Sequence, residues 1–506
     1  MSTTISWEKE AEASISKVPA MIRPMVKKKV ERRAKALNKQ VITSELLSEL
    51  RAKMMPASGS SSKRLEEFYA KTDAPPILAG FKRQNKGPHA GMGNMEPVEN
   101  PATVWPKLSQ TTDPAKKRAL YIHIPFCLAR CKFCSFYHSK TDKQAISSYV
   151  SYLMKELEMT AESNYARSTP FHAVYFGGGT PTDLLPGEFK QLLQHLNSYW
   201  NLANDCEITV EGRLFGFDDE KVEACLDNGV NRFSFGVQSF NTEIRRQMGR
   251  VMKREQLFSR LKYLVETGKA NISADLIYGF PEQTDEIWLD DMRSVVESGV
   301  DSSSIYRLKL MDSSPIVEQV EQGKLSSPAG IEKQAQQFAA SNEFFRNINA
   351  VRTGVTHWAF TNRERCIYNS ISAFGGSCLP VGCGAGGNIG PYRVMQRMSL
   401  EQYAGMVTEG RKPTVLVSRS AANQSTVSLI NGELALYLGT NLKEISRKTG
   451  ETDQNERFKP LLRQWADAGM VNYNAVSGLL TLTDAGVFHF PTLSQLLLDY
   501  NIWKQQ

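Results

Sequence analysis

Three cysteines, Cys127, Cys131 and Cys134, lie within one segment of eight residues. The chain opens without an apolar leader segment, so we expect these thiols to be reduced and free to bind a metal. Their C-x3-C-x2-C spacing lets one loop contact three corners of a four-iron, four-sulfur cube and leaves the fourth iron without a protein thiolate. His138 could instead complete a zinc site, and the spacing alone leaves that alternative open.

A glycine triplet, Gly177, Gly178 and Gly179, follows the predicted strand at 173–176 and is itself followed by Thr180-Pro181. Glycines at such a position let the backbone approach a ligand closely at the carboxyl rim of a parallel sheet. An isolated triplet is usually only a tight turn. Because this one follows the strand next after the cysteine loop, it indicates a second part of the same site.

The elements that must position these loops alternate between short apolar runs and helical segments from about residue 120 to residue 311. That alternation is typical of repeated βα units around a parallel sheet or barrel. Helices are expected at 146–161, 187–200 and 331–347. Strands are expected at 120–124, 173–176, 207–210, 232–237, 271–277 and 304–308.

The regions outside this core differ in composition and pattern. Apolar residues recur at helical spacing near the N-terminus, and helices followed by a two-stranded wing are expected near the C-terminus, where the lack of a basic stripe favours packing over DNA binding. The predicted domains are a small helical domain at 1–53, a linker and extended arm at 54–118, a barrel core at 119–311, a barrel extension with a Gly-rich segment at 312–428, and a winged-helix-like domain at 429–506.

Composition describes an ordinary globular protein of 506 residues, with 41% hydrophobic and 23% charged residues. These values argue against disorder, collagen and coiled coil. No apolar run of about 18 residues is present, so we expect a cytoplasmic protein with no membrane partner. Residues 1–118 carry 22 Lys and Arg against 12 Asp and Glu, whereas the rest carry 39 against 41. We therefore expect no nucleic-acid partner, although the basic N-terminus could attract an acidic protein or substrate carboxylates.

An ordered series of motifs then resembles the radical S-adenosylmethionine (SAM) superfamily, within the group typified by oxygen-independent coproporphyrinogen dehydrogenase. The motifs are Tyr-Ile-His-Ile-Pro-Phe-Cys at 121–127, Phe-Gly-Gly-Gly-Thr-Pro-Thr at 176–182, Glu211-Gly, Asn-Arg-Phe-Ser-Phe-Gly-Val-Gln-Ser-Phe at 231–240, Gly249-Arg250, and Asp-Leu-Ile-Tyr-Gly-Phe-Pro-Glu-Gln-Thr at 275–284. The resemblance implies an α/β fold with a partial (β/α)6 TIM-like barrel. It also implies a 4Fe–4S cluster on Cys127, Cys131 and Cys134, and SAM bound to the open iron.

In that family an electron from the cluster cleaves SAM to methionine and a 5′-deoxyadenosyl radical, and members of this group can hold two SAM molecules. By chemistry, Arg250 could grip a carboxylate with two hydrogen bonds, while Glu211, Gln238 and Asp275 could accept from ribose hydroxyls or an ammonium group. Each residue alone could equally belong to a helix cap or a buried ion pair. The residues implied to bind SAM are Tyr121, Phe133, Gly178, Gly179, Thr180, Glu211, Gln238, Arg250 and Asp275.

Within the group, the coproporphyrinogen enzymes carry a further Cys where this chain has Phe136. The haem-chaperone branch shares the Phe but is typically shorter. The long N-terminus, Phe136 and the segment Phe-Gly-Gly-Ser-Cys-Leu-Pro-Val-Gly-Cys at 374–383 resemble best the haem-utilisation branch, the anaerobilin synthases, which open haem without oxygen by transferring a SAM-derived carbon. A haem-binding chaperone and an oxygen-independent coproporphyrinogen III dehydrogenase remain the alternatives.

The N-terminal helical unit resembles a terminal domain of a subunit of light-independent protochlorophyllide reductase, so both resemblances converge on a tetrapyrrole. The partners implied are haem and an electron donor such as a flavodoxin. Candidate haem contacts are His123, His138 and His357, each of which could be a structural histidine instead. Cys378 and Cys383 could bind metal or substrate, but small buried apolar roles are favoured.

Overall fold

The computed structural model describes residues 5–16, 23, 26–27, 30–31, 34, 37, 39–54, 65–81, 96–97, 101–112, 117–134, 139–140, 142–311, 314–419 and 424–504. Phe136 and His138 lie outside these residues, as do Lys28, Lys29, Arg32 and Arg33 of the basic N-terminal run. The chain divides into two compact units, residues 1–64 and residues 65–506, and each is described by itself.

The N-terminal unit pairs two short parallel strands, β1 (Ser6–Trp7) and β2 (Val41–Ile42), beside the helices α1 (Lys9–Ser16) and α3 (Ser44–Met54). Acidic residues in the first turn of both helices favour helix formation through the helix dipole. The unit has a small apolar core of its own, built from Ala11, Val30, Ala34, Ile42 and Leu46.

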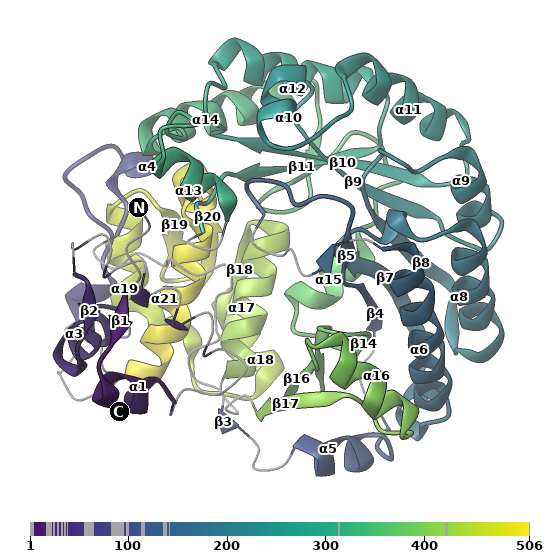
Figure 1. Ribbon diagram of the computed structural model, residues 1–506. Helices are drawn as coiled ribbons and strands as arrows, with labels where there is room; N and C mark the ends of the chain where they lie inside the picture. Colours follow the sequence, from purple (N-terminus) through teal and green to yellow (C-terminus); the bar gives the residue numbers. More distant parts are fainter. Residues whose placement is uncertain are drawn as a thin grey trace. The chain divides into compact units, whose positions relative to one another are not determined.

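The larger unit is built around six parallel strands in the order β4, β7, β8, β9, β10 and β11, as Figure 1 shows. The strands are β4 (Arg118–Ile124), β7 (Phe171–Gly178), β8 (Leu202–Gly212), β9 (Arg232–Gln238), β10 (Asn271–Tyr278) and β11 (Ser302–Arg307). The helices between them include α6 (Lys143–Ala161), α8 (Pro186–Tyr199), α9 (Asp219–Leu226), α10 (Thr242–Gln247), α11 (Arg254–Glu266) and α12 (Asp285–Glu297). The expected partial (β/α)6 barrel is therefore confirmed.

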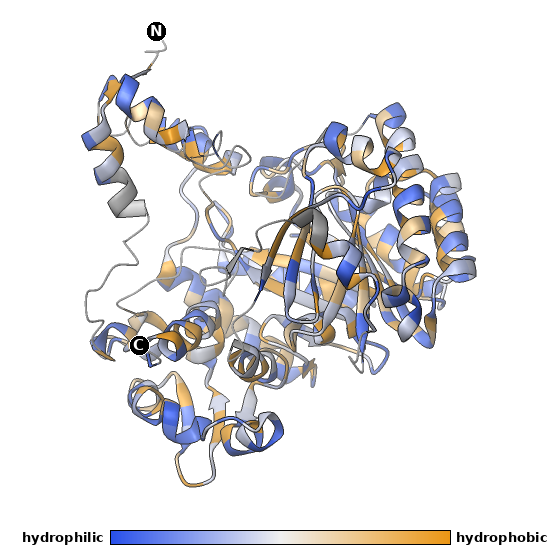
Figure 2. Ribbon diagram, turned by 90° about the horizontal axis from the view of Figure 1, so that it is seen from below, coloured by the Kyte–Doolittle hydropathy of each residue, from blue (hydrophilic) through white to orange (hydrophobic). Residues whose placement is uncertain are grey.

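Successive side chains along each strand point alternately toward the surrounding helices and toward the barrel interior. On β4, Leu120, Ile122 and Ile124 are buried in the same apolar cluster as Val150 and Leu153 of α6. The residues between them point to the opposite face. In Figure 2 the helices around the barrel carry both hydrophobic and hydrophilic residues, as helices with one face on a core must.

The sheet does not close into a full barrel but continues beyond both edges to thirteen strands among the described residues. The Gly-rich segment of the expected barrel extension, at 375–390, forms β14 (Ser377–Val381), which pairs parallel with β4, and β15 (Gly386–Ile389). Next come β16 (Tyr392–Gln396), β17 (Thr414–Arg419) and β3 (Glu96–Pro97), with α16 (Leu400–Thr408) packed against α6, while β13 (His357–Ala359) and β12 (Val351–Arg352) extend the other edge.

The C-terminal region has the winged-helix-like arrangement that the sequence predicts. Its three-stranded sheet has the order β18 (Gly439–Asn441), β20 (Leu479–Leu482) and β19 (Val471–Asn474). The helices are α17 (Gln424–Tyr437), α18 (Leu442–Thr449), α19 (Gln454–Asp467), α20 (Asp484–Phe488) and α21 (Phe490–Trp503).

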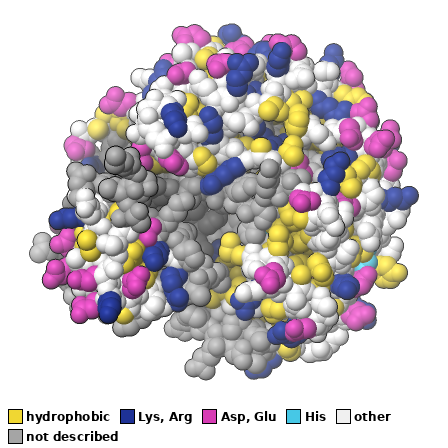
Figure 3. Space-filling view, in the orientation of Figure 1, with side chains coloured by type: hydrophobic (Ala, Val, Ile, Leu, Met, Phe, Trp, Pro, Cys, Tyr) yellow, Lys and Arg dark blue, Asp and Glu magenta, His cyan; other side chains and the backbone are white. Residues whose placement is uncertain are grey.

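Part of the stretch expected to be a linker packs onto this larger unit. Trp465 of α19 donates a 3.0 Å hydrogen bond to the carbonyl of Phe68, which is itself buried. A helix not expected from the sequence, α5 (Pro101–Leu108), contacts β17. The described helices include none both long and apolar enough to cross a bilayer. In Figure 3, acidic and basic side chains are interspersed over the visible described surface.

Candidate functional site

The three-cysteine loop begins at the carboxyl end of β4, where Cys127 lies in the short strand β5 (Phe126–Cys127). Cys127 and Cys131 are buried and Cys134 is half-buried. The backbone N–H of Cys134 donates to the carbonyl of Cys131 at 3.1 Å, which closes a turn. The loop therefore presents three thiols at one end of the barrel, as the sequence predicts.

Hydrogen bonds from three sequence-distant segments hold this loop. The N–H of Leu128 donates to Oδ2 of Asp183 at 2.9 Å. Lys132 is held on both sides: its N–H donates to the carbonyl of Met248 at 3.2 Å, and its carbonyl accepts from the N–H of Ile316 at 2.8 Å. The position of the cysteines is thus set by the folded barrel rather than by the loop alone.

The glycine triplet after β7 lies directly against the cysteine loop. A Cβ on Gly179 would sit 2.3 Å from the carbonyl oxygen of Phe126, and a Cβ on Gly178, where φ is +112°, would sit 2.6 Å from the His123 ring. Both positions therefore require glycine. Thr180 donates a 3.4 Å hydrogen bond to Cys127 Sγ, which opposes the larger effect of burial in raising the pKa of that thiol.

A pocket opens beside this loop at the ends of β8 and β9. Gly236 is in its lining, and a Cβ there would lie 2.5 Å from Nε2 of Gln238 and 3.5 Å from Nη2 of Arg250. The side chains of Gln238 and Arg250 thus both lie close to Gly236, where a larger residue would collide with Gln238. The remaining lining residues are Leu128, Ala129, Arg213, Leu214, Phe215, Arg245, Gly249, Val251, Met252 and Leu257.

Three of the predicted SAM residues carry polar atoms that are buried and have no hydrogen-bond partner in the described part of the chain: Oε1 of Gln238, Nε of Arg250 and Oδ1 of Asp275. Gln238 also has a φ of +73°, which is uncommon for a residue other than glycine. Buried polar atoms are costly without partners. Such atoms occur elsewhere in the interior too, for example on Asn271, but here Arg250 also lines an open pocket beside the cysteine loop, which suits a polar ligand.

The two predicted carboxyl groups, Glu211 on β8 and Asp275 on β10, both lie in the barrel interior. Burial is the main cause that raises the pKa of Glu211 to about 7, with a further contribution from the Asp275 charge, while a 3.2 Å hydrogen bond from Tyr175 opposes it. Burial likewise raises the pKa of Asp275 to about 6. A positively charged ligand between them would favour both ionised forms.

Aromatic side chains form the wall beneath these carboxyl groups. Tyr121 stacks on Tyr175 with ring centroids 6.2 Å apart, and Tyr175 stacks at 4.3 Å on Tyr368 of α15 (Ile367–Ala373). Phe133, in the cysteine loop, has the Arg250 guanidinium 5.9 Å from its ring centroid. The structure therefore brings Tyr121 and Phe133 close to the other predicted SAM residues.

The two described histidines of interest have different surroundings. Nδ1 of His123 lies 3.0 Å from the Tyr121 hydroxyl, and its ring lies over Gly178 at the mouth of the barrel. His357 is buried on β13, with Nδ1 2.9 Å from Ser304 Oγ and Nε2 3.5 Å from Glu364. His123 is therefore near the cysteine loop, whereas His357 lies deep in the barrel.

Cys378 and Cys383 are both buried, and burial raises the pKa of each thiol to about 12. Cys383 follows Gly382, whose N–H donates to Oε2 of the buried Glu156 at 2.8 Å. Lys412 neutralises Glu156 at 2.6 Å. These contacts fix the Gly-rich segment beside β4, and both cysteines occupy the buried environment that sequence reasoning favoured.

Several residues near the pocket were not expected from the sequence. Arg213 donates to Thr180 Oγ1 at 3.0 Å, and Arg245 donates to the carbonyl of Ser239 at 3.0 Å. Asp291 accepts from the N–H of Phe240 at 2.6 Å and from the Ser239 hydroxyl. Only Arg213 carried a usable signal, because it directly follows the Glu211-Gly motif.

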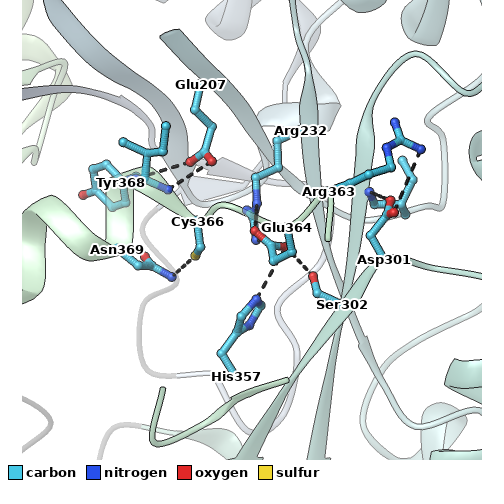
Figure 4. A network of polar contacts seen from close by, with 12 residues as sticks. Glu207, Arg232, Asp301, Ser302, His357, Arg363, Glu364, Cys366, Tyr368 and Asn369 are labelled. Carbon is cyan, nitrogen blue, oxygen red and sulfur yellow. Dashed lines mark hydrogen bonds and ion pairs between the residues drawn. The ribbon is translucent and has the colours of Figure 1, made fainter. Parts of the chain in front are cut away.

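The opposite end of the barrel interior is closed by a segment, residues 361–368, that we call the base strap (Figure 4). Its Glu364 accepts two hydrogen bonds from Arg232, at 3.1 and 3.2 Å, and another from Ser302. Its backbone N–H groups at Ile367 and Tyr368 donate to the carboxylate of Glu207 at 3.0 and 3.3 Å. The carboxylates of Glu207 and Glu364 at the base are thus paired within the chain.

Comparison with known proteins agrees with this geometry. The family model described as the Radical SAM superfamily matches residues 121–295, and the model described as the Proto-chlorophyllide reductase 57 kD subunit matches residues 7–51. Anaerobilin synthase of Escherichia coli O157:H7 is 34% identical over 400 residues, covering 79% of this chain and 88% of that protein. Heme chaperone HemW of Bacillus subtilis (strain 168) is 26% identical over 372 residues, covering 72% of this chain and 95% of the relative.

Among solved structures, Escherichia coli coproporphyrinogen III oxidase (HemN), titled a radical SAM enzyme, has a TM-score of 0.68 at 22% identity, covering 78% of this chain and 93% of that one. This likeness shows the fold. Together with the identity to anaerobilin synthase, it shows that the chain is a radical SAM enzyme. It belongs to the HemN-like group of that superfamily, whose relatives act in haem and porphyrin chemistry.

The family uses a 4Fe–4S cluster and SAM, and the residues present fit both groups. One loop supplies three thiols and no fourth, which suits a cluster with one open iron. The adjoining pocket offers the guanidinium of Arg250, and the amide of Gln238 lies next to the lining residue Gly236. Both side chains have an unsatisfied buried atom, which suits the carboxylate and polar groups of SAM.

Proposed function

We propose that this chain degrades haem without oxygen, transferring a SAM-derived methyl or methylene carbon to the macrocycle with ring opening to a linear tetrapyrrole and release of iron. The observation that carries the proposal is the 34% identity to anaerobilin synthase over 88% of that protein. The haem chaperones match at lower identity, such as 26% for the protein of Bacillus subtilis.

In this proposal the cluster is held by Cys127, Cys131 and Cys134, and when bound it supplies the electron that cleaves SAM. The chain's own residues orient SAM and exclude water from it. Arg250 pairs with a carboxylate, and Glu211 and Asp275 accept from hydroxyl or ammonium groups. The full proposed set for one or two SAM molecules is Tyr121, Phe133, Gly178, Gly179, Thr180, Glu211, Gln238, Arg250 and Asp275.

Haem is the proposed substrate, and a flavodoxin-type protein or another reductant is the proposed electron donor. His123 is a candidate haem contact because it lies at the barrel mouth, between the cysteine loop and the Gly-rich segment at Gly382 and Gly384. His138 is a further candidate from its sequence position alone. His357, which is buried on β13, is the third candidate.

The test is an anaerobic incubation of reconstituted protein with haem, dithionite and SAM carrying a deuterated methyl group. Deuterium is expected both in the tetrapyrrole product and in 5′-deoxyadenosine, because hydrogen is taken from the methyl group of a second SAM. Loss of the Soret band and release of iron should accompany labelling. Mass spectrometry of both products measures the outcome.

Unlabelled 5′-deoxyadenosine together with unchanged haem would reject the proposal in favour of a haem-binding chaperone. In a parallel incubation with coproporphyrinogen III in place of haem, loss of hydrogen from a propionate would instead indicate the oxidative decarboxylase. The control variant is Cys206→Ala, because Cys206 is buried on β8 and lies outside the cysteine loop. It should retain the labelling pattern of the parent protein.

A further inference from the structure

Arg213 joins three segments at the mouth of the barrel. It follows Gly212, the last residue of β8, and its guanidinium contacts both the cysteine loop and the residue after the glycine triplet. Nη1 donates to the carbonyl of Ala129 at 3.3 Å, and Nη2 donates to Oγ1 of Thr180 at 3.0 Å. Ala129 stands between the first two cysteines of the loop. One planar guanidinium therefore ties the loop to the end of the triplet.

Asp183, in the short helix η3 (Pro181–Asp183), completes this contact. Its Oδ2 accepts from the N–H of Leu128 at 2.9 Å and lies 3.9 Å from Nη2 of Arg213. The side chains of Asp183 and Arg213 are only 10% and 13% exposed. Because the carboxylate balances the guanidinium, the pair adds little net charge beside the cysteines. The contribution of Arg213 at this place is therefore mainly its directed N–H groups.

The chemistry of the groups fixes the direction of these hydrogen bonds. Arginine can only donate, so the hydroxyl oxygen of Thr180 accepts from Nη2 of Arg213. The single hydrogen of the Thr180 hydroxyl is directed to Sγ of Cys127, 3.4 Å away. A thiolate that ligates a metal carries no hydrogen, so in the loaded protein Cys127 can only accept. The donors therefore run in order from Arg213 through Thr180 to the sulfur.

Arg213 differs in this respect from Arg250, although both line the pocket. Both terminal nitrogens of Arg213 already donate within the chain, to Ala129 and Thr180. Arg250 keeps a buried Nε without a hydrogen-bond partner in the described part of the chain. Arg250 is therefore the better candidate for a SAM carboxylate, and Arg213 is the better candidate for a fixed part of the cluster site.

We propose that Arg213 is a positioning residue for the cluster, which directs the Thr180 hydroxyl to the sulfur of Cys127 and so makes the cluster easier to reduce. Hydrogen bonds to the ligating sulfurs are among the factors that set the reduction potential of an iron–sulfur cluster. They raise it because they stabilise the more negative, reduced state. This inference rests on the proposed cluster site at Cys127, Cys131 and Cys134, and it does not depend on haem as the substrate.

Two buried threonines make a matched pair for the experiment. Thr180→Val removes the hydroxyl that donates to Cys127. Thr209→Val makes the same change on β8, where the buried Thr209 hydroxyl has no hydrogen-bond partner in the described part of the chain. Each protein is reconstituted with iron and sulfide and kept free of SAM. Iron content is measured first, and the midpoint potential is then obtained by titration with dithionite, with electron paramagnetic resonance following the reduced cluster.

Thr180→Val should lower the ratio of reduced to oxidised cluster about tenfold at a given potential, which moves the midpoint by about 59 mV to more negative values for one electron. Thr209→Val should keep the parent midpoint, whatever its effect on stability, and so should Thr180→Ser, which retains the hydroxyl. Equal midpoints for the two valine variants would overturn the proposal. A parent protein that assembles no cluster would instead refute the proposed cluster site, so the two failures are distinguishable.

A variant that combines Arg213→Met with Asp183→Asn provides the second comparison, because it removes the arginine and leaves the net charge of the pair unchanged. It should shift the midpoint in the same direction as Thr180→Val. Adding Thr180→Val to it should cause little further shift, since the arginine acts through the threonine. Additive shifts would contradict the proposal. So would an unchanged midpoint together with weaker SAM binding by isothermal titration, because Arg213 would then be a ligand-binding arginine.

Discussion

The two ends of the barrel interior are both polar, yet they differ in how their charged groups are paired. At the base, Glu364 accepts from Arg232 and Ser302, and Asp301 accepts from the N–H of Ile272 at 2.9 Å. At the mouth, Gln238 and Arg250 each keep a buried atom without a partner in the described chain. Unpaired buried atoms also occur near the base, on Asn271 and Ser273. The difference is therefore that the base pairs its charged groups with one another, whereas the mouth combines unpaired atoms with an open pocket.

The largest expected effect comes from removing one of the three cysteines at the mouth of the barrel, because no other residue of the loop can replace its thiolate. Cys127→Ala, Cys131→Ala or Cys134→Ala should abolish the brown cluster absorbance and all SAM cleavage, because two thiolates cannot hold the cube with one open iron. Iron content and 5′-deoxyadenosine release measure the loss. Normal iron and normal cleavage in any of the three variants would refute the assignment of the cysteine loop.

A base residue should instead affect folding. Glu364→Gln leaves the buried guanidinium of Arg232 without its counter-charge, and the free energy of unfolding should fall by about 3–5 kcal/mol. Chemical denaturation of the cofactor-free protein measures it. The matched variant Glu409→Gln breaks an exposed ion pair with Arg411 and should change stability little. Equal stability of the two variants would remove the distinction between base and mouth.

Arg250→Met tests the mouth for ligand binding in a protein that keeps all three cysteines of the loop. The variant should weaken SAM binding by about 1.5–3 kcal/mol, the worth of a charge-assisted hydrogen bond. It should cost little stability, since burial lowers the pKa of Arg250 and the folded chain gains little from its charge. Protein that unfolds more readily but keeps its SAM affinity would indicate a structural arginine instead.

Two carboxyl groups on β8, one at each end of the barrel, should affect the pH dependence of stability in different ways. Glu211 at the mouth has a pKa of about 7 against an ordinary 4.5, so folding is favoured while it is protonated and loses stability as pH rises from 4.5 to 7. Glu211→Gln should therefore raise the free energy of unfolding of the cofactor-free protein by on the order of 1–3 kcal/mol at pH 8 and by nothing near pH 4.

Glu207 lies on the same strand at the base, where it accepts from two backbone N–H groups of the base strap. Glu207→Gln should therefore lower stability at pH 8 rather than raise it. Urea denaturation at several pH values measures both variants. A destabilised Glu211→Gln at pH 8 would mean that this carboxyl group serves the fold and not a ligand.

The smallest expected effect follows from deleting residues 1–53. No motif of the barrel mouth lies there, so SAM cleavage driven by dithionite should be unchanged. With an acidic protein donor at low salt, the deletion variant should turn over more slowly than the full-length protein. At high salt the two rates should become similar, because charge steering is screened within about 10 Å at 0.1 M salt. Unchanged turnover with both reductants at low salt would rule out a docking role.

The sequence predicts the mouth better than the base. Alternating strands and helices place the six barrel strands correctly, and the motifs bring Gln238 together with Arg250 because parallel strands end at one edge. The base depends on partners that are distant in sequence, such as Arg232 with Glu364, and no local pattern reveals such a pair. The contact of His357 with Ser304 likewise joins residues that are distant in sequence.

The anchoring of the cysteine loop has a consequence for how the enzyme matures. Lys132, between the second and third cysteines, is tied to Met248 and Ile316, both of which are synthesised long after it. During translation the three thiols are therefore exposed on an unanchored loop, and their final arrangement must wait for the rest of the barrel. A folded acceptor for the cluster should therefore form only after the chain has been synthesised beyond Ile316.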